Sequence, residues 1–141
     1  MARNEIFRDA DHLSLPVPAG KKAGDPVRVG GLNGVCETDR AKTDVPAYNQ
    51  DGTRNASYNY GGGNPNGHAT VWLKGGHEFD VEFAVAAVGD PVYILPDGTA
   101  LTDEPDDGGS PAVENPVYGH ALTTKAATVG TPSPLTVRIA N

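Results

Sequence analysis

Histidines and carboxylates gather in one stretch of the chain, and these are the residue types that bind metals or transfer protons. His68, His77 and Glu78 lie close together, and Asp80 and Glu82 follow at alternate positions. Adjacent residues of a strand point to opposite faces, so His77 and Glu78 would not converge on one ion. Asp80 and Glu82 share a strand face that we expect to be solvated. The stretch therefore predicts neither a metal site nor an acid–base pair.

Two further motifs have the composition of chemical sites. The run at 61–67 (GGGNPNG) is glycine-rich, but no Lys-Ser/Thr pair follows it, so a flexible turn is favoured over a phosphate-binding loop. Cys36 is the only cysteine, which excludes an internal disulfide. We expect it to be a small buried hydrophobic residue on a strand. The sequence thus predicts a protein that is not an enzyme and needs no cofactor.

The charge balance bears on partners. The formal net charge is −7, and the 11 lysines and arginines are scattered singly apart from Lys21-Lys22. Binding to nucleic acid rests on clustered basic residues, so we expect no direct nucleic-acid partner. The first residues lack the apolar core of a signal peptide, and no later stretch is long and apolar enough for a membrane span. We expect a soluble product made in the cytoplasm, with no membrane partner.

The elements that must position any site are strands. Apolar residues alternate with polar ones along six stretches, at 13–17, 27–29, 69–73, 79–85, 92–94 and 135–139, within a set of roughly eight strands. Turn dipeptides stand at Asn33-Gly34, Asp51-Gly52, Asn66-Gly67 and Asp97-Gly98. No segment has good helical periodicity. The fold class is all-β, a small β-barrel or β-sandwich.

One motif occurs twice. An Asp-Pro turn is followed by a β-branched strand at 24–29 (GDPVRV) and again at 89–94 (GDPVYI), and the residues at 34–39 parallel those at 98–103. Both copies predict a strand, a tight turn and a second strand. Each copy has three structural turn residues, which are Gly24, Asp25 and Pro26 in the first and Gly89, Asp90 and Pro91 in the second.

Three segments lie outside the strand pattern. Residues 1–11 predict an extended N-terminal arm, and 12–141 a single β domain. Within that domain, 40–68 form a long polar insertion and 103–116 an acidic loop that we expect to be solvated. The insertion contains Tyr48, Tyr58 and Tyr60, which predict either a contact surface or packing of the loop on its own domain.

Trp72 falls on the opposite strand face from Val71 and Leu73. This position predicts either a second apolar layer or contact with a neighbouring subunit.

The order of these motifs resembles the head decoration, or capsid cement, proteins of tailed bacteriophages. The similar parts are 17–35, 81–98 and 119–139, about half the chain, including Ala-Gly-Asp-Pro-Val, Gly-Leu-x-Gly-Val, Gly-Asp-Pro-Val-Tyr and a closing Leu-Thr-Val-Arg-Ile. The insertion at 40–68 and the acidic loop at 103–116 depart from the compact pattern of that family.

The resemblance implies a small β-barrel-like domain, typically a homotrimer, on the outer surface of the virion capsid. Its partner would be the major capsid protein, whose neighbouring subunits it links. The resemblance also implies that the N-terminal arm reaches along the capsid, through the residues Arg3, Asn4, Glu5, Ile6, Phe7 and Arg8.

A second interpretation is a β-sandwich module that recognises glycans or host surfaces through the tyrosine-rich loop. It predicts binding of a soluble ligand that is lost when Tyr58 or Tyr60 is replaced by alanine. A third interpretation, a small hydrolase, requires convergent titratable residues, and the sequence offers no such set.

Overall fold

The computed structural model describes residues 10–42, 45–58 and 63–141, and these form nine strands and no helix. Each strand is short, and many are separated by glycine turns with positive φ. The strands are β1 His12–Pro16, β2 Pro26–Val29, β3 Leu32–Cys36, β4 His68–Trp72, β5 Gly76–Val81, β6 Pro91–Ile94, β7 Leu101–Thr102, β8 Val117–Ala121 and β9 Ser133–Ile139. The all-β prediction is confirmed.

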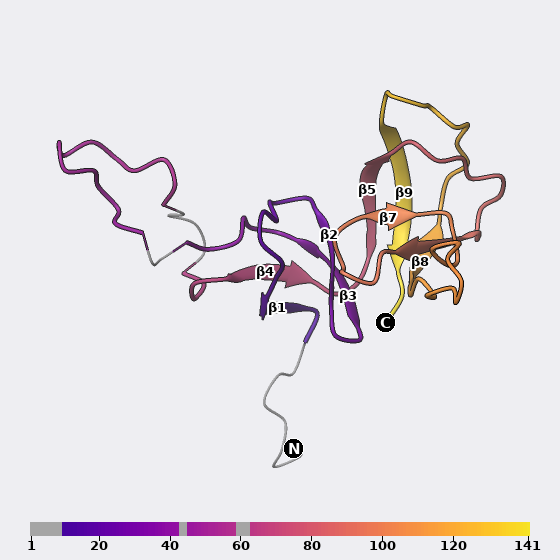
Figure 1. Ribbon diagram of the computed structural model, residues 1–141, viewed down its shortest axis with the longest axis horizontal. Coiled ribbons are helices and arrows are strands. Elements are labelled where there is room, and N and C mark those ends of the chain that lie inside the picture. Colours follow the sequence, from indigo (N-terminus) through magenta and orange to yellow (C-terminus); the bar gives the residue numbers. More distant parts are fainter. Residues whose placement is uncertain (1–9, 43–44, 59–62) are drawn as a thin grey trace, which may run out of the picture.

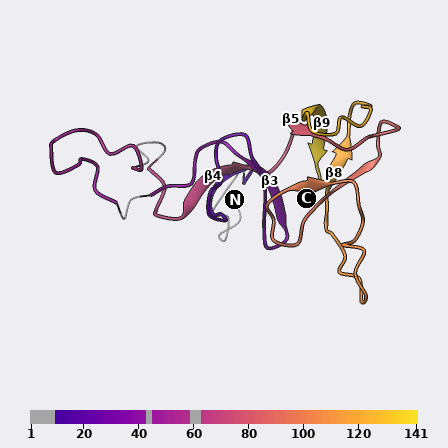
Figure 2. The same cartoon turned by 45° about the horizontal axis from the view of Figure 1, so that its top comes forward.

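The strands form two antiparallel sheets. Four strands make the first sheet, in the order β1-β4-β3-β2, and five make the second, in the order β5-β9-β8-β6-β7. The second sheet curls into a half-barrel. The two sheets lie side by side, while residues 45–58, here called the tongue, project away from both (Figure 1 and Figure 2).

Several sequence expectations need correction. The strand predicted at 79–85 ends at Val81, although Val85 stays buried and forms an isolated bridge with Lys125. Strand β8 was not predicted, because Gly119 interrupts its alternation. Asn33-Gly34 is not a turn: both residues lie within β3, and Gly30, with a φ of 59°, takes the turn position.

The predicted repeat is present, and its two copies form equivalent backbone hydrogen bonds. In the first copy the Gly24 N–H donates to the Cys36 carbonyl at 2.7 Å, and the Cys36 N–H donates to the Asp25 carbonyl at 2.9 Å. In the second copy Gly89, Asp90 and Ala121 make the same two bonds at 2.8 and 2.9 Å. Each aspartate also accepts a backbone N–H at 2.8 Å, from Lys22 and from Ala87 respectively.

The repeat comprises four strands rather than a hairpin. The order β1-β4-β3-β2 recurs as β5-β9-β8-β6, and the pair Val27–Gly34 corresponds to Val92–Gly119. The expected parallel between 34–39 and 98–103 is therefore wrong, since Gly119 is the counterpart of Gly34. The β6–β8 connection at 95–116 contains β7 and the acidic loop, and this insertion hides the true counterpart in the sequence.

Both glycines are required by close packing. A Cβ on Gly34 would overlap Val71 Cγ1 and lie 2.6 Å from the Trp72 carbonyl oxygen. A Cβ on Gly119 would overlap the Arg138 carbonyl oxygen. The neighbouring strand in each sheet thus leaves no room for any side chain at these two positions.

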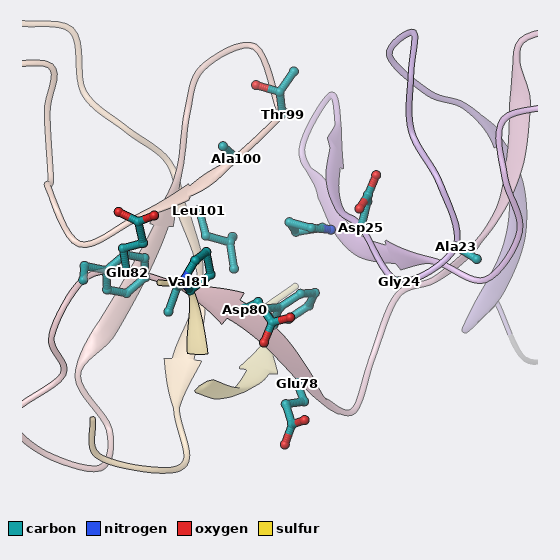
Figure 3. Close-up of a pocket in the computed structure, with 14 residues that line it drawn as sticks. Ala23, Gly24, Asp25, Glu78, Asp80, Val81, Glu82, Thr99, Ala100 and Leu101 are labelled. Atoms are coloured by element: carbon teal, nitrogen blue, oxygen red, sulfur yellow. The ribbon is translucent and has the colours of Figure 1, made fainter. Parts of the chain in front are cut away.

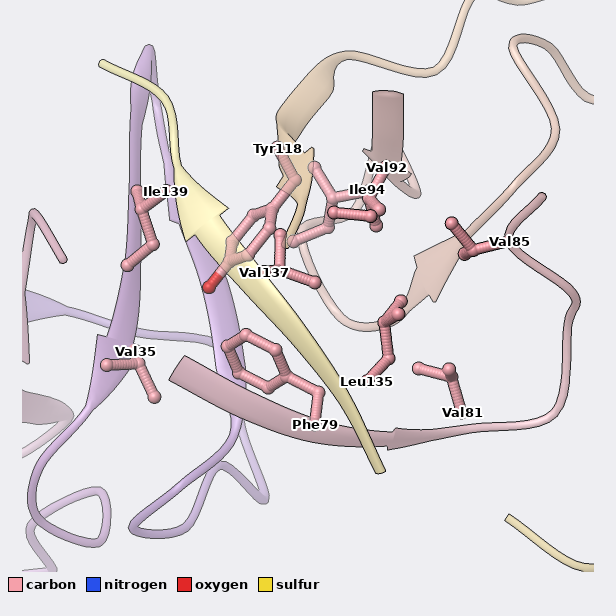
Figure 4. Packing of buried hydrophobic residues seen from close by; sticks show 11 residues of the cluster. Val35, Phe79, Val81, Val85, Val92, Ile94, Tyr118, Leu135, Val137 and Ile139 are labelled. Carbon is pink, nitrogen blue, oxygen red and sulfur yellow. The ribbon is translucent and has the colours of Figure 1, made fainter. Parts of the chain in front are cut away.

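The sheets have separate apolar clusters that meet at β3. One cluster lies on the first sheet and includes Val27, Cys36 and Val71. The larger one fills the half-barrel and includes Tyr118 and Leu135, and Val35 of β3 joins it from the first sheet (Figure 4). Because successive residues of β3 face opposite ways, this strand contributes to both clusters.

Polar bonds hold the two sheets together. The buried Tyr118 hydroxyl donates to the Gly34 carbonyl at 2.6 Å. The Asn33 side-chain amide donates to the Val117 and Ala140 carbonyls at 3.0 and 2.7 Å, and the Asn33 N–H donates to Asn141 Oδ1 at 2.7 Å. These bonds fix how the two sheets meet.

Candidate functional site

The predicted site residues do not converge on one place. The arm residues 3–8 and Tyr60 lie outside the described residues. The remaining ones fall on separate surfaces: Trp72 on β4, Tyr48 and Tyr58 on the tongue, and the six turn residues at the starts of β2 and β6.

Trp72 lies on the face of the first sheet that also carries its pairing partner Val35, opposite to the face of Val71. Its neighbours Val71 and Leu73 are buried, whereas Trp72 is 37% exposed. The His12 ring stacks on the indole with 4.4 Å between ring centroids, and His12 Nε2 also contacts the Glu37 carboxylate. Trp72, His12 and Glu37 together are called the Trp72 surface.

The Trp72 surface lies where the N-terminal segment meets the domain. His12 begins β1, which is an edge strand and, among the described residues, pairs only with β4. Just before it, Asp11 forms an ion pair with Lys74, and its carbonyl accepts the Leu73 N–H at 2.7 Å. The start of the domain is thus fixed beside an exposed aromatic residue and the unpaired side of an edge strand.

The tongue is an ordered turn structure. Tyr48 and Arg54 form an isolated antiparallel bridge, and the Asn49 N–H donates to the Thr53 carbonyl at 2.8 Å. Tyr48 is 57% exposed. Tyr58, at the other end of the tongue, lines a pocket of about 310 Å³ together with the charged residues Lys22, Asp39, Arg40 and Lys42. Lys21 also lines it, but its Nζ donates to the Pro26 and Thr99 carbonyls, which lie outside this pocket. An anionic group is the ligand that such a pocket favours.

A larger groove of about 820 Å³ runs along β5. One wall is formed by residues 78–83, and the opposite wall by the turn at 23–26 and by Thr99, Ala100 and Leu101 (Figure 3). Since β5 and β7 are the two edges of the curled sheet, the groove lies at the open seam of the half-barrel.

The groove is apolar inside and acidic at its rim. Phe79 and Val81 are buried, and Leu101 packs against their cluster from β7. The lining includes four carboxylates, Asp25, Glu78, Asp80 and Glu82, and no lysine or arginine. Lys21 lies behind the wall at 23–26 and interacts with Asp25, so the carboxylates without a nearby cation of this kind are those on the β5 side. Glu82 Oε2 accepts the Gly130 N–H at 3.3 Å, but no ion pair between described residues includes any of the four.

Buried ionisable groups lie nearby without forming a reactive centre. Burial raises the pKa of the Cys36 thiol to about 11, so the thiol is the stable form at neutral pH. Burial lowers the pKa of Lys21, whose Nζ donates to the Pro26 and Thr99 carbonyls at 2.6 Å each. Lys21 thereby ties the first repeat turn to the turn before β7.

No group of three or more potential metal ligands gathers among the described residues. His77 Nε2 contacts the Lys74 carbonyl at 3.0 Å, and His68 Nδ1 contacts the Asn66 carbonyl at 3.2 Å. These histidines interact with backbone near their own positions. In the acidic loop, hydrogen bonds from the Val113 and Gly109 N–H groups lower the pKa of Asp107 and fold the exposed loop upon itself.

Sequence reasoning missed the groove and the basic pocket. The alternation of Glu78, Asp80 and Glu82 was visible, but the pairing that leaves this side of β5 open was not. The basic pocket combines residues from 20–22, 39–42 and 56–58, whose proximity follows from the fold alone.

The chain matches no family model, no curated protein and no solved structure. Within the described residues, no helix has the length and apolar character needed to cross a membrane.

Proposed function

We propose that this protein is a non-enzymatic decoration, or cement, protein of a tailed-phage head. It binds the outside of the expanded shell as a homotrimer and links neighbouring major capsid protein subunits. The observation that carries the proposal is the edge at β1. There the exposed Trp72 and a strand side that no described strand pairs with lie beside the start of the domain, directly after the arm.

Such an edge has the properties of a docking surface. An unpaired strand side can accept a strand from another protein, and tryptophan is prominent among residues that dominate binding energy. In the arm, Ile6 and Phe7 supply apolar contact, while Arg3 and Arg8 pair with acidic groups of the shell. The resemblance of the repeated motifs to cement proteins supports the phage context.

Binding would stabilise the shell by linkage. A protein that binds the expanded shell and not its precursor stabilises it by RT ln(1 + [L]/Kd), about 2.7 kcal/mol per site when the free protein is at a hundredfold excess over Kd. A trimer engages several points at once, and its later contacts form at high effective concentration. Modest single contacts therefore suffice.

Co-sedimentation with phage heads tests the proposal. The purified protein should bind saturably to expanded empty heads and not to unexpanded precursors. Deletion of residues 2–11 should abolish binding while the domain stays folded by circular dichroism. Absence of binding by the full chain to either kind of head would overturn the proposal.

A ligand-binding module is the second candidate, and the pocket at Tyr58 favours it. The pocket brings an aromatic side chain together with lysines and an arginine, an arrangement suited to anionic glycans. Calorimetric titration with sulfated and carboxylated oligosaccharides should then show binding that Tyr58→Ala or Tyr60→Ala removes and that Tyr48→Ala retains. Binding of heads without binding of any glycan would reject this candidate.

A further inference from the structure

We propose that the groove along β5 is a strand-acceptor site for an extended segment of the shell subunit in which basic side chains alternate with apolar ones. The identity of this partner rests on the proposed function. The site is distinct from the arm and from the Trp72 surface.

The backbone of β5 is available for pairing on its outer side. Within the described ranges, β5 pairs only with β9, and no backbone hydrogen bond outside that ladder includes a residue of 76–81. Alternate N–H and C=O groups of a strand point to opposite sides, so about half of those on β5 point toward the groove. They provide the pairing sites that strand addition requires.

The seam of the half-barrel gives the added strand a second wall. Leu101 of β7 and the turn at 23–26 stand opposite β5 across the groove. A strand placed between them would extend the curled sheet from its β5 edge toward its β7 edge. Its inward side chains would lie over Phe79 and Val81, which favours valine, isoleucine or leucine.

The carboxylates at the rim of the groove determine which charge is favoured on the outward face of the added strand. Glu78 and Asp80 are exposed and alternate with the inward residues of β5, and the exposed Glu82 follows the strand directly. A strand paired with β5 places its outward side chains beside these carboxylates, where lysine or arginine is favoured. On the β9 side, the residues directly opposite Glu78 and Asp80 are Thr136 and Pro134, and neither is a cation. Arg138 lies opposite Gly76, and no ion pair found between described residues joins it to these carboxylates.

A synthetic peptide of alternating lysine and valine tests the chemistry of the groove. We expect saturable binding that weakens as salt rises, and slower hydrogen exchange of amides in 76–81. A matched peptide with glutamate for lysine should not bind. A lysine–valine peptide with alternate backbone N-methyl groups should bind about tenfold more weakly, because it cannot complete a ladder.

Charge reversal tests the location. The double variant Glu78→Lys/Asp80→Lys should weaken peptide binding about tenfold or more. The control Asp103→Lys/Glu104→Lys makes the same change of net charge in the acidic loop and should leave binding unchanged. Equal effects of the two variants, or no slowing of exchange in 76–81 by the peptide, would overturn the groove as the site.

Hydrogen exchange and binding measured with expanded heads distinguish this proposal from the proposed function. If heads bind the protein, exchange in 76–81 should slow on the shell, and the groove variant should lower head affinity while the acidic-loop control does not. Head binding without these effects overturns the groove proposal and leaves the decoration function standing. No head binding overturns the function and with it the identity of the partner, whereas peptide binding still reports on the chemistry of the groove.

Discussion

Replacing Tyr118 by phenylalanine should reveal how firmly the two sheets are joined. The ring is fully buried and packs edge-on against Phe79 with 5.7 Å between centroids, and phenylalanine retains that packing. The change removes only the hydroxyl that donates to the Gly34 carbonyl at 2.6 Å. Loss of a bond to a buried carbonyl costs about 2 kcal/mol, and for a chain of this length we expect Tm to fall by about 7 °C.

Urea and thermal unfolding followed by circular dichroism measure the effect. Tyr93→Phe is the matched control, because Tyr93 is only half-buried and none of the side-chain hydrogen bonds found between described residues includes its hydroxyl. The control should lie within about 0.5 kcal/mol of the parent protein. If Tyr118→Phe is equally mild, the hydroxyl does not join the sheets and the reasoning is wrong.

Three further changes have definite expected outcomes. Gly119→Ala should prevent folding or cost at least about 3 kcal/mol in urea unfolding, because its Cβ would overlap the Arg138 carbonyl, whereas Gly31→Ala, with nothing within 4 Å, should change stability by less than about 0.5 kcal/mol. The raised pKa of Cys36 means that the unfolded chain releases the thiol proton near pH 9 and the folded chain near pH 11, so the free energy of unfolding falls as pH rises between them; Cys36→Ala should remove about 2 to 3 kcal/mol of that fall. Under the proposed function, Trp72→Ala should weaken head binding by about 2 kcal/mol in co-sedimentation, while Val88→Ala, at a residue that is 64% exposed, should not.

The sequence predicted the parts of the fold that rest on local chemistry. Period-two alternation located strands such as β6 and β9, and Asp-Pro after glycine located both repeat turns. The turns predicted from dipeptides are present where the glycine adopts a positive φ, as at Gly52 and Gly98. Local backbone preference decides these features, so they are visible in a short window of sequence.

Features that depend on distant pairing were hidden. Asn33-Gly34 has the composition of a turn, but β4 approaches so closely that Gly34 is required within a strand. The strand of the second copy that corresponds to β3 is β8. An insertion that contains β7 separates β8 from β6, so comparison of the two motifs in the sequence matched β3 with β7 instead. The groove has the same origin, because its lining comes from four separate segments of the chain, and their meeting depends on how the sheet curls.

The repeated unit also offers a route to a smaller protein. The β3–β4 connection at 37–67 contains the tongue, whereas the equivalent β8–β9 connection at 122–132 joins the same two positions of the unit with far fewer residues. The second copy is thus a natural template for shortening the first. The ends of the longer connection belong to the fold, because Ala41 is buried and exchanges backbone hydrogen bonds with Gly67 and His68. The part to shorten is therefore the tongue alone, which also marks a place where foreign peptides can be inserted at little entropic cost.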